Sequence, residues 1–161
     1  MAVEAPISKY KKTNFKIFFG ICIAIAIIFA YDGYLSKYKW SGRYSFYKEH
    51  VIDNGGKPTP TMNFNRKSPP FFLAAAVLFA VSLYLFKDKR LVADEYELVI
   101  SDKKRISYDS IQQIDKTYFQ KKGFFVITYK NKGGAEVRLR LSDRKYDNLS
   151  AVLEHLVAKI T

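Results

Sequence analysis

The sequence is poor in the side chains that most often carry chemistry. Its 161 residues include one cysteine and two histidines. The single cysteine, Cys22, allows no disulfide within the chain and no cysteine-based metal site. His50 and His155 are isolated, and such histidines are more often surface residues than ligands. No stretch matches a nucleophile elbow, a phosphate-binding loop or an HExxH zinc motif. We therefore expect a non-enzymatic protein with no metal and no cofactor.

Long runs of like charge are also missing. The chain has 27 Lys and Arg residues against 15 Asp and Glu residues, a net charge of +12, but no run of like charge exceeds three residues. A nucleic-acid-binding arm would concentrate its basic residues in one segment. We therefore expect no nucleic-acid partner and interpret the basic excess as attraction to anionic membrane lipids.

Two long uncharged runs are the strongest signal that the sequence does contain. Residues 17–31 read IFFGICIAIAIIFAY, and with its flanks this first predicted span covers residues 14–35. Residues 68–86 read SPPFFLAAAVLFAVSLYLF and have basic residues on both sides. At about 1.5 Å per residue, each run is long enough to cross a hydrocarbon core of about 30 Å. The sequence therefore predicts two transmembrane helices.

Two other interpretations of these runs are a pair of buried core helices and, for the first run, a cleaved signal peptide. The other residues are markedly polar and could not easily surround two such helices. The stretch before the first run is basic, as in signal peptides, but no small-x-small cleavage site stands out near residues 29–32. We favour two uncleaved spans in the cell (inner) membrane.

Two spans place both termini on one side of the membrane. Near the span ends, seven Lys and Arg residues lie on the terminal side and seven in the connecting loop, so the positive-inside rule does not choose a side. The short N-terminal basic tail, residues 1–13, is easily retained in the cytoplasm. We therefore expect both termini to be cytoplasmic.

The connecting loop, residues 36–67, divides into an aromatic half and a half rich in glycine and proline. Aromatic rings with polar tips are enriched at the headgroup layer, so we expect the aromatic half to lie along the membrane face. A ligand or partner surface is the alternative. The expected interfacial aromatic residues, counted from the end of the first span, are Tyr34, Tyr38, Trp40, Tyr44, Phe46 and Tyr47.

The pattern changes in residues 87–161, where apolar and polar side chains alternate. In GGAEVRLRLS, residues 133–142, the alternation is typical of a half-buried strand. The turn NKGG joins this strand to the one before it, as in a β-hairpin. The predicted strands are residues 96–101, 105–108, 111–119, 123–130 and 136–142, with 91–93 as a weaker sixth.

The last segment has the periodicity of a helix. From residue 143 to residue 160 the apolar positions are spaced by three and four, which predicts an amphipathic helix that begins near Ser142 or Asp143. Its apolar face needs a partner surface, and the strands supply one. We therefore predict an α+β membrane protein, in which two transmembrane helices precede an antiparallel β-barrel or sandwich closed by a C-terminal helix.

Three stretches carry a resemblance to a known family: ISYDSIQQID (residues 106–115), KKGFFVITY (121–129) and YDNLSAVLEHLVAKI (146–160). With these stretches the chain resembles bacterial pleckstrin-homology-like (PH-like) membrane proteins, in which one or two spans precede a domain of about seven strands and a C-terminal helix. The resemblance covers residues 88–161. It implies a partly open barrel used as a binding or assembly surface, and it implies no particular ligand.

Basic residues gather at the predicted turns and on one strand. The candidates for contact with a headgroup or a partner are Lys103, Lys104, Arg105, Lys121, Lys122, Arg138 and Arg140. We expect a scaffold or accessory subunit that binds other integral membrane proteins at the membrane surface. The alternative is a sensor of anionic lipid headgroups or of a small ligand, which would use the same basic turns.

Overall fold

The computed structural model describes residues 2–101 and 104–160, which form two compact units. The helical unit comprises residues Asn14–Tyr84. The β-unit combines the residues up to Thr13 with those from Leu85 onward, so its chain enters twice. The α+β class is confirmed, with two long apolar helices, two antiparallel sheets and a C-terminal helix.

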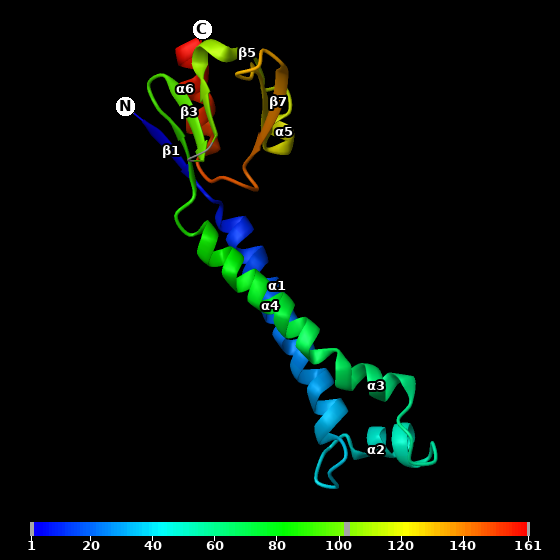
Figure 1. Cartoon of the computed structure of the whole chain (residues 1–161). Coiled ribbons are helices and arrows are strands. Elements are labelled where there is room, and N and C mark those ends of the chain that lie inside the picture. Colours follow the sequence, from blue (N-terminus) through cyan, green and yellow to red (C-terminus); the bar gives the residue numbers. More distant parts are fainter. Residues whose placement is uncertain (1, 102–103, 161) are drawn as a thin grey trace. The chain divides into compact units, whose positions relative to one another are not determined.

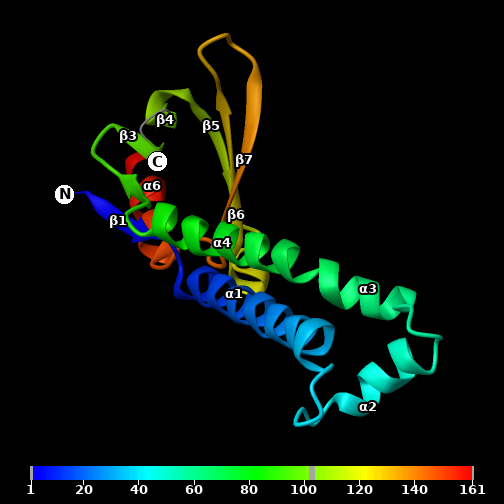
Figure 2. The ribbon, with the colours of Figure 1, turned by 60° about the horizontal axis from the view of Figure 1, so that its bottom comes forward.

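The helical unit is built around helices α1 (Lys9–Ala30) and α4 (Pro69–Phe86), which lie side by side in Figures 1 and 2. The ring of Phe79 lies 5.6 Å, centroid to centroid, from the rings of both Phe15 and Phe18. The ring of Phe29 lies 5.6 Å from that of Phe72. These contacts pair the start of α1 with the end of α4, so the helices run antiparallel. Both are long and apolar enough to cross a membrane.

The side chains of α1 and α4 are mostly exposed. Ala26 is the buried residue of α1, and Pro69 and Ala76 are those of α4. Large apolar side chains such as Phe71 and Leu78 are 74% and 68% exposed. A core helix of a water-soluble protein would bury such side chains. The exposure therefore favours lipid as their surroundings.

The segment between the two long helices is folded into short helices, whereas the sequence predicted a loop over residues 36–67 and counted residues 31–35 in the first span. Its elements are the π-helical turns η1 (Tyr31–Leu35) and η2 (Lys48–Ile52) and the helices α2 (Tyr44–Tyr47) and α3 (Pro60–Lys67). Thr59 caps α3 by accepting a hydrogen bond from the Met62 amide, and Pro60 occupies the first turn. Gly33 of η1 lies against α3, where a Cβ would be 2.9 Å from the Asn65 carbonyl oxygen.

The first sheet of the β-unit contains a strand that we had assigned to the N-terminal tail. Strand β1 (Val3–Pro6) pairs antiparallel with β2 (Arg90–Ala93), and β3 (Glu97–Ser101) and β4 (Lys104–Ser107) complete the order β1-β2-β3-β4. Ala5 of β1 is fully buried opposite Leu91. Residues 3–6 therefore belong to the folded β-unit, and both long helices are inserted between its first two strands.

The second sheet has the order β5-β6-β7, with strands β5 (Ile111–Asp115), β6 (Phe124–Lys130) and β7 (Glu136–Ser142). The 3₁₀ turn η3 (Tyr108–Ser110) connects it to β4. β5 is shorter than the predicted strand 111–119, because residues Phe119–Lys122 form a helical turn, α5. Gly123 ends α5 with a φ of +66°, a conformation that glycine adopts without strain.

Helix α6 (Leu149–Ile160) begins six residues after the predicted start at 143. Residues 144–147 are held instead by the N-terminal segment: the Ser8 amide donates to the Lys145 carbonyl at 2.9 Å, and the Asp147 amide donates to the Pro6 carbonyl at 2.9 Å. Asn148 then adopts a φ of 58°. α6 packs against β1 and β2 through its buried apolar face.

The core of the β-unit lies between the two sheets and α6. Its largest fully buried side chains include Phe125 and Ile127 of β6, Leu98 of β3 and Leu156 of α6. Alternate residues of β6 and β7 point into this core, as the period of two predicts. The hydrophobic core fixes the positions of the turns that carry the basic residues.

Candidate binding clefts

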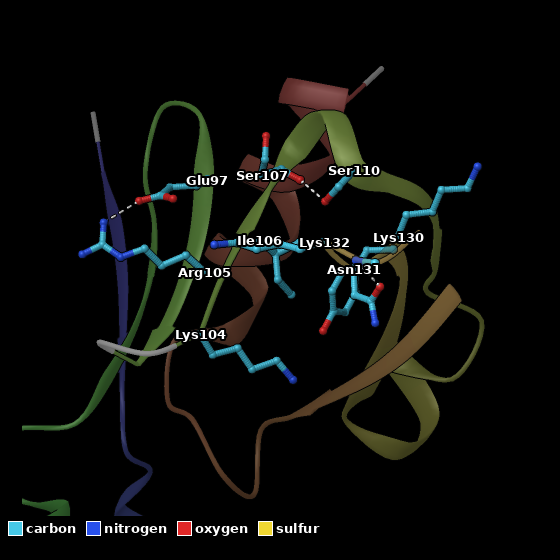
Figure 3. Close-up of a pocket in the computed structure, with 11 residues that line it drawn as sticks. Glu97, Lys104, Arg105, Ile106, Ser107, Ser110, Lys130, Asn131 and Lys132 are labelled. Carbon is cyan, nitrogen blue, oxygen red and sulfur yellow. Dashed lines mark hydrogen bonds and ion pairs between the residues drawn. The ribbon is translucent and has the colours of Figure 1, made fainter. Parts of the chain in front are cut away.

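One cleft of the β-unit lies between its two sheets (Figure 3) and measures about 700 Å³. Its walls are strand β4 on one side and the end of β6 with the following turn on the other. β4 is an edge strand, and β3 is its neighbour in the sheet. We call this the inter-sheet cleft. Among the predicted candidates, Lys104 and Arg105 line it.

Of the basic side chains that line the inter-sheet cleft, Arg105 forms an ion pair, whereas the lysines lie along the gap. Arg105 is ion-paired with Glu97 on the adjacent strand, at 2.8 Å between Nη1 and Oε1, and this pair points away from the gap (Figure 3). Lys104 points into the gap, with its ammonium 5.9 Å from the ring centroid of Tyr129. Lys130 and Lys132 are exposed at the other wall. Three lysine charges therefore remain for an anionic group.

The turn that carries Lys130 and Lys132 is fixed by Asn131. The Asn131 side-chain oxygen accepts from the amides of Gly133 at 2.9 Å and Ala135 at 3.0 Å. Gly134 has a φ of +79°, which closes the turn. This wall of the cleft is therefore preorganised, which lowers the conformational entropy lost on binding.

A second cleft, of about 520 Å³, contains the predicted candidates Lys121 and Lys122. Both lysines belong to α5, and the opposite wall is formed by Tyr10 in the first turn of α1 and by Arg144. We call it the helix-base cleft. The sequence did not reveal Tyr10 and Arg144 as parts of a site, because they lie more than 100 residues apart and neither belongs to a motif.

The remaining predicted basic residues lie elsewhere. Arg138 and Arg140 are exposed on the outer face of the second sheet. The Arg140 guanidinium lies 3.7 Å from the ring centroid of Phe124, which stacks on Tyr118 at 5.5 Å. Lys103 lies outside the described residues. The structure thus separates the basic candidates into two clefts and one sheet face.

The predicted interfacial aromatic residues belong to the helical unit. Tyr34, Tyr38 and Trp40 are exposed by 52%, 43% and 70%, and the last two stack at 5.6 Å with an angle of 12° between their planes. The remaining three, Tyr44, Phe46 and Tyr47, are half-buried in α2. The segment 34–40 is therefore the exposed aromatic part, and α2 is its folded support.

A polar contact joins α6 to the turn between β2 and β3. The Tyr108 hydroxyl donates to the Asp94 carbonyl at 2.7 Å, and Nε2 of His155 contacts the same oxygen at 3.0 Å. Because a carbonyl can only accept, Nε2 is the donor. Burial, together with the negative charges of Asp94 and Glu97, raises the pKa of Tyr108 to about 12. His155 is thus a structural contact of α6.

Within residues 2–101 and 104–160, no three His, Cys, Asp or Glu side chains lie close enough together to hold a metal ion. Comparison of the chain with protein-family models, with curated proteins and with solved structures gives no significant match. The two clefts and the long apolar helices α1 and α4 are therefore the features that indicate a function.

Proposed function

We propose that this chain is a non-enzymatic integral membrane protein whose β-unit is a binding scaffold, as an accessory subunit of a membrane protein complex. The observation that carries the proposal is the β1–β2 pairing, which ties the start of α1 and the end of α4 into one folded unit. With α1 and α4 as spans, that unit is fixed at the membrane surface by two covalent connections. The β-unit would then stay at the membrane surface, as a scaffold must.

The arrangement of the β-unit supports the resemblance to PH-like membrane proteins. Among the described residues, seven strands in two antiparallel sheets and a C-terminal helix match the strand content and the closing helix that this resemblance implies. In this chain the first strand precedes the two helices. The resemblance implies a partly open barrel that binds on its surface, and the inter-sheet cleft is the opening that fits this role.

The chemistry of the inter-sheet cleft favours an acidic, extended segment of a partner protein. The free edge of β4 offers backbone hydrogen-bonding groups to an added strand, a common mode of peptide recognition. Lys104, Lys130 and Lys132 supply positive charge beside that edge. Tyr129 adds a buried ring below Lys104. Charge steers the segment, and the strand edge holds it.

The test is co-purification of partners from membranes in mild detergent, using the full chain. Lys104→Glu with Lys132→Glu places two negative charges in the cleft, and we expect at least a tenfold loss of the partner. The matched control is Lys116→Glu with Lys159→Glu, two exposed positions outside the inter-sheet cleft. Equal retention of the partner by both variants would contradict the proposal.

A photo-crosslinking residue at Ser107 sharpens this test. Ser107 is exposed on β4 and lines the cleft, so we expect it to crosslink to the partner that the charge variants lose. A crosslinker at Lys159 is the control, and we expect it to give no such product. Crosslinking at Lys159 alone would place the partner on another surface.

A further inference from the structure

The helix-base cleft joins positive charge to the first turn of a predicted span. Its lining includes Tyr10 of α1, Lys121 and Lys122 of α5, and the adjacent residues Asp143 and Arg144. Three cations face one carboxylate, which leaves a net charge of +2. The volume, about 520 Å³, is within the range of small-molecule sites.

Hydrogen bonds fix Arg144 beside the start of α1. The Ser8 hydroxyl donates to the Arg144 carbonyl at 2.6 Å, and the Ser8 amide donates to the Lys145 carbonyl at 2.9 Å. The Ser8 oxygen also accepts from the Lys11 amide at 3.1 Å and so caps α1. One buried serine therefore holds a distant basic segment against the first turn of the helix.

The two lysines of α5 are fixed from the other side. The Asp143 amide donates to the Gly123 carbonyl at 2.8 Å. The Asp143 carboxylate occupies the space where a Cβ on Gly123 would be. This close approach sets α5 next to Arg144. The three cations of the cleft are therefore carried by a preorganised frame.

The distance along α1 from Tyr10 to the uncharged run indicates where the cleft lies relative to the membrane. The uncharged run begins at Ile17, seven residues later, which is about 10 Å along a helix. With α1 as a span, a side chain at Tyr10 lies at the level of the phospholipid headgroups. Lys11 of α1 and Lys89, which follows α4, add positive charge within the same unit, and their ammonium groups lie 4.0 and 5.6 Å from the Phe86 ring centroid.

We propose that the helix-base cleft binds the phosphate of an anionic phospholipid from the leaflet that α1 enters. The guanidinium of Arg144 and the ammonium groups of Lys121 and Lys122 donate to the phosphate oxygens. The Tyr10 ring lies at the lipid interface, where its hydroxyl can donate to the headgroup. This site is separate from the inter-sheet cleft and needs no protein partner. It differs from general attraction to a charged surface, because it requires three named cations.

The experiment uses the full chain in detergent micelles or in nanodiscs and counts bound lipids by native mass spectrometry. Phosphatidylglycerol and phosphatidylcholine are the two probes. We expect the wild-type chain to retain phosphatidylglycerol preferentially, and Lys121→Gln with Lys122→Gln and Arg144→Gln to reduce that retention at least tenfold. Lys121→Arg with Lys122→Arg keeps the charge and should keep the lipid.

The matched control removes three exposed cations outside the cleft: Arg138→Gln, Arg140→Gln and Lys159→Gln. We expect this variant to retain the lipid, with an unchanged near-ultraviolet circular dichroism spectrum in all variants. An equal loss of phosphatidylglycerol from both triple variants would mean that diffuse surface charge retains the lipid, and it would overturn the proposed site. Displacement of the lipid by millimolar inorganic phosphate would identify a free phosphate site instead and would overturn the lipid assignment.

Discussion

In the helical unit polar and apolar side chains are buried in similar numbers, whereas in the β-unit the buried side chains are almost all apolar. The helical unit buries Asp32, Ser36, Ser41, Asn65 and Ser68 and exposes Phe71 and Leu78. The β-unit buries Phe125, Ile127 and Leu156 and exposes its lysines. The difference fits the proposal that the two units have different surroundings, with water around the β-unit and lipid around the two long helices.

The sharpest test of this contrast uses the same substitution in both units. Phe125 of β6 is fully buried and Phe71 of α4 is 74% exposed. Phe125→Ala removes a ring from a packed core, and we expect a loss of about 3 to 5 kcal/mol in the free energy of unfolding of the β-unit. Phe71→Ala leaves no cavity, so we expect a change below about 1 kcal/mol.

Thermal or denaturant unfolding in mild detergent, followed by near-ultraviolet circular dichroism, measures both variants. The prediction is that Phe125→Ala lowers the free energy of unfolding more than Phe71→Ala does. If Phe71→Ala were as costly as Phe125→Ala, the face of α4 that carries Phe71 would be buried against protein, and the contrast would fail.

The next test addresses the polar interior of the helical unit. The Arg43 side chain donates to both carboxylate oxygens of Asp32 at 2.8 Å, and this hydrogen bonding raises the pKa of Arg43 above its ordinary value. Asp32 is 6% exposed, whereas the Arg43 side chain is half-exposed. We expect Asp32→Asn to destabilise the connecting segment by about 1 to 2 kcal/mol, because a charged hydrogen bond is lost but Arg43 remains solvated.

Hydrogen exchange over residues 31–52 measures this effect, with Asp53→Asn as the control at an exposed position of the same segment. We expect faster exchange in the Asp32 variant only. Unchanged protection would mean that packing alone maintains the segment and that its buried polar groups are not needed.

The smallest expected effect concerns one polar group in the interior of the β-unit, the hydroxyl of Tyr108. Tyr108→Phe removes the hydrogen bond to the Asp94 carbonyl and should cost about 1 kcal/mol. The pKa of Tyr108 is about 12 in the fold against an ordinary value of 10. The wild-type advantage is therefore full below pH 10 and decreases as the pH rises towards 12, because the unfolded chain ionises first.

Unfolding free energies of both chains at pH 8 and pH 11 check this prediction. We expect the difference between them to be smaller at pH 11. A constant difference would mean that Tyr108 ionises equally in the folded and unfolded chains.

The sequence predicted the helices and strands whose own residues show a clear pattern of apolar side chains. The run 68–86 corresponds to α4 (Pro69–Phe86), and the alternation in 136–142 corresponds to β7. Strand β1 was missed because four residues, VEAP, are too few to show a period, and their partner begins 84 residues later. The late start of α6 also depends on a contact between residues far apart in the sequence, because Pro6 and Ser8 hydrogen-bond to residues 144–147.

The clefts were predictable only in part, for a related reason. The lysines of the turns could be identified from their sequence, since turns expose charged residues. Tyr10 and Arg144 could not be joined to them, because the contact depends on the hydrogen bonds of Ser8. The ion pair between the buried Asp32 and the half-exposed Arg43 was also not predictable, since an acid and a base eleven residues apart in a polar segment are ordinary.

The separation of β1 from β2 also has a consequence for biosynthesis. The ribosome makes β1 before both long helices and its partner β2 only after them. With both helices as spans, the β-unit could close only if β1 lay on the side of the membrane where the second helix delivers residues 90–93. If α1 and α4 are spans, as proposed, completion of the sheet requires correct insertion of both helices, and a chain that fails this step keeps an open strand edge.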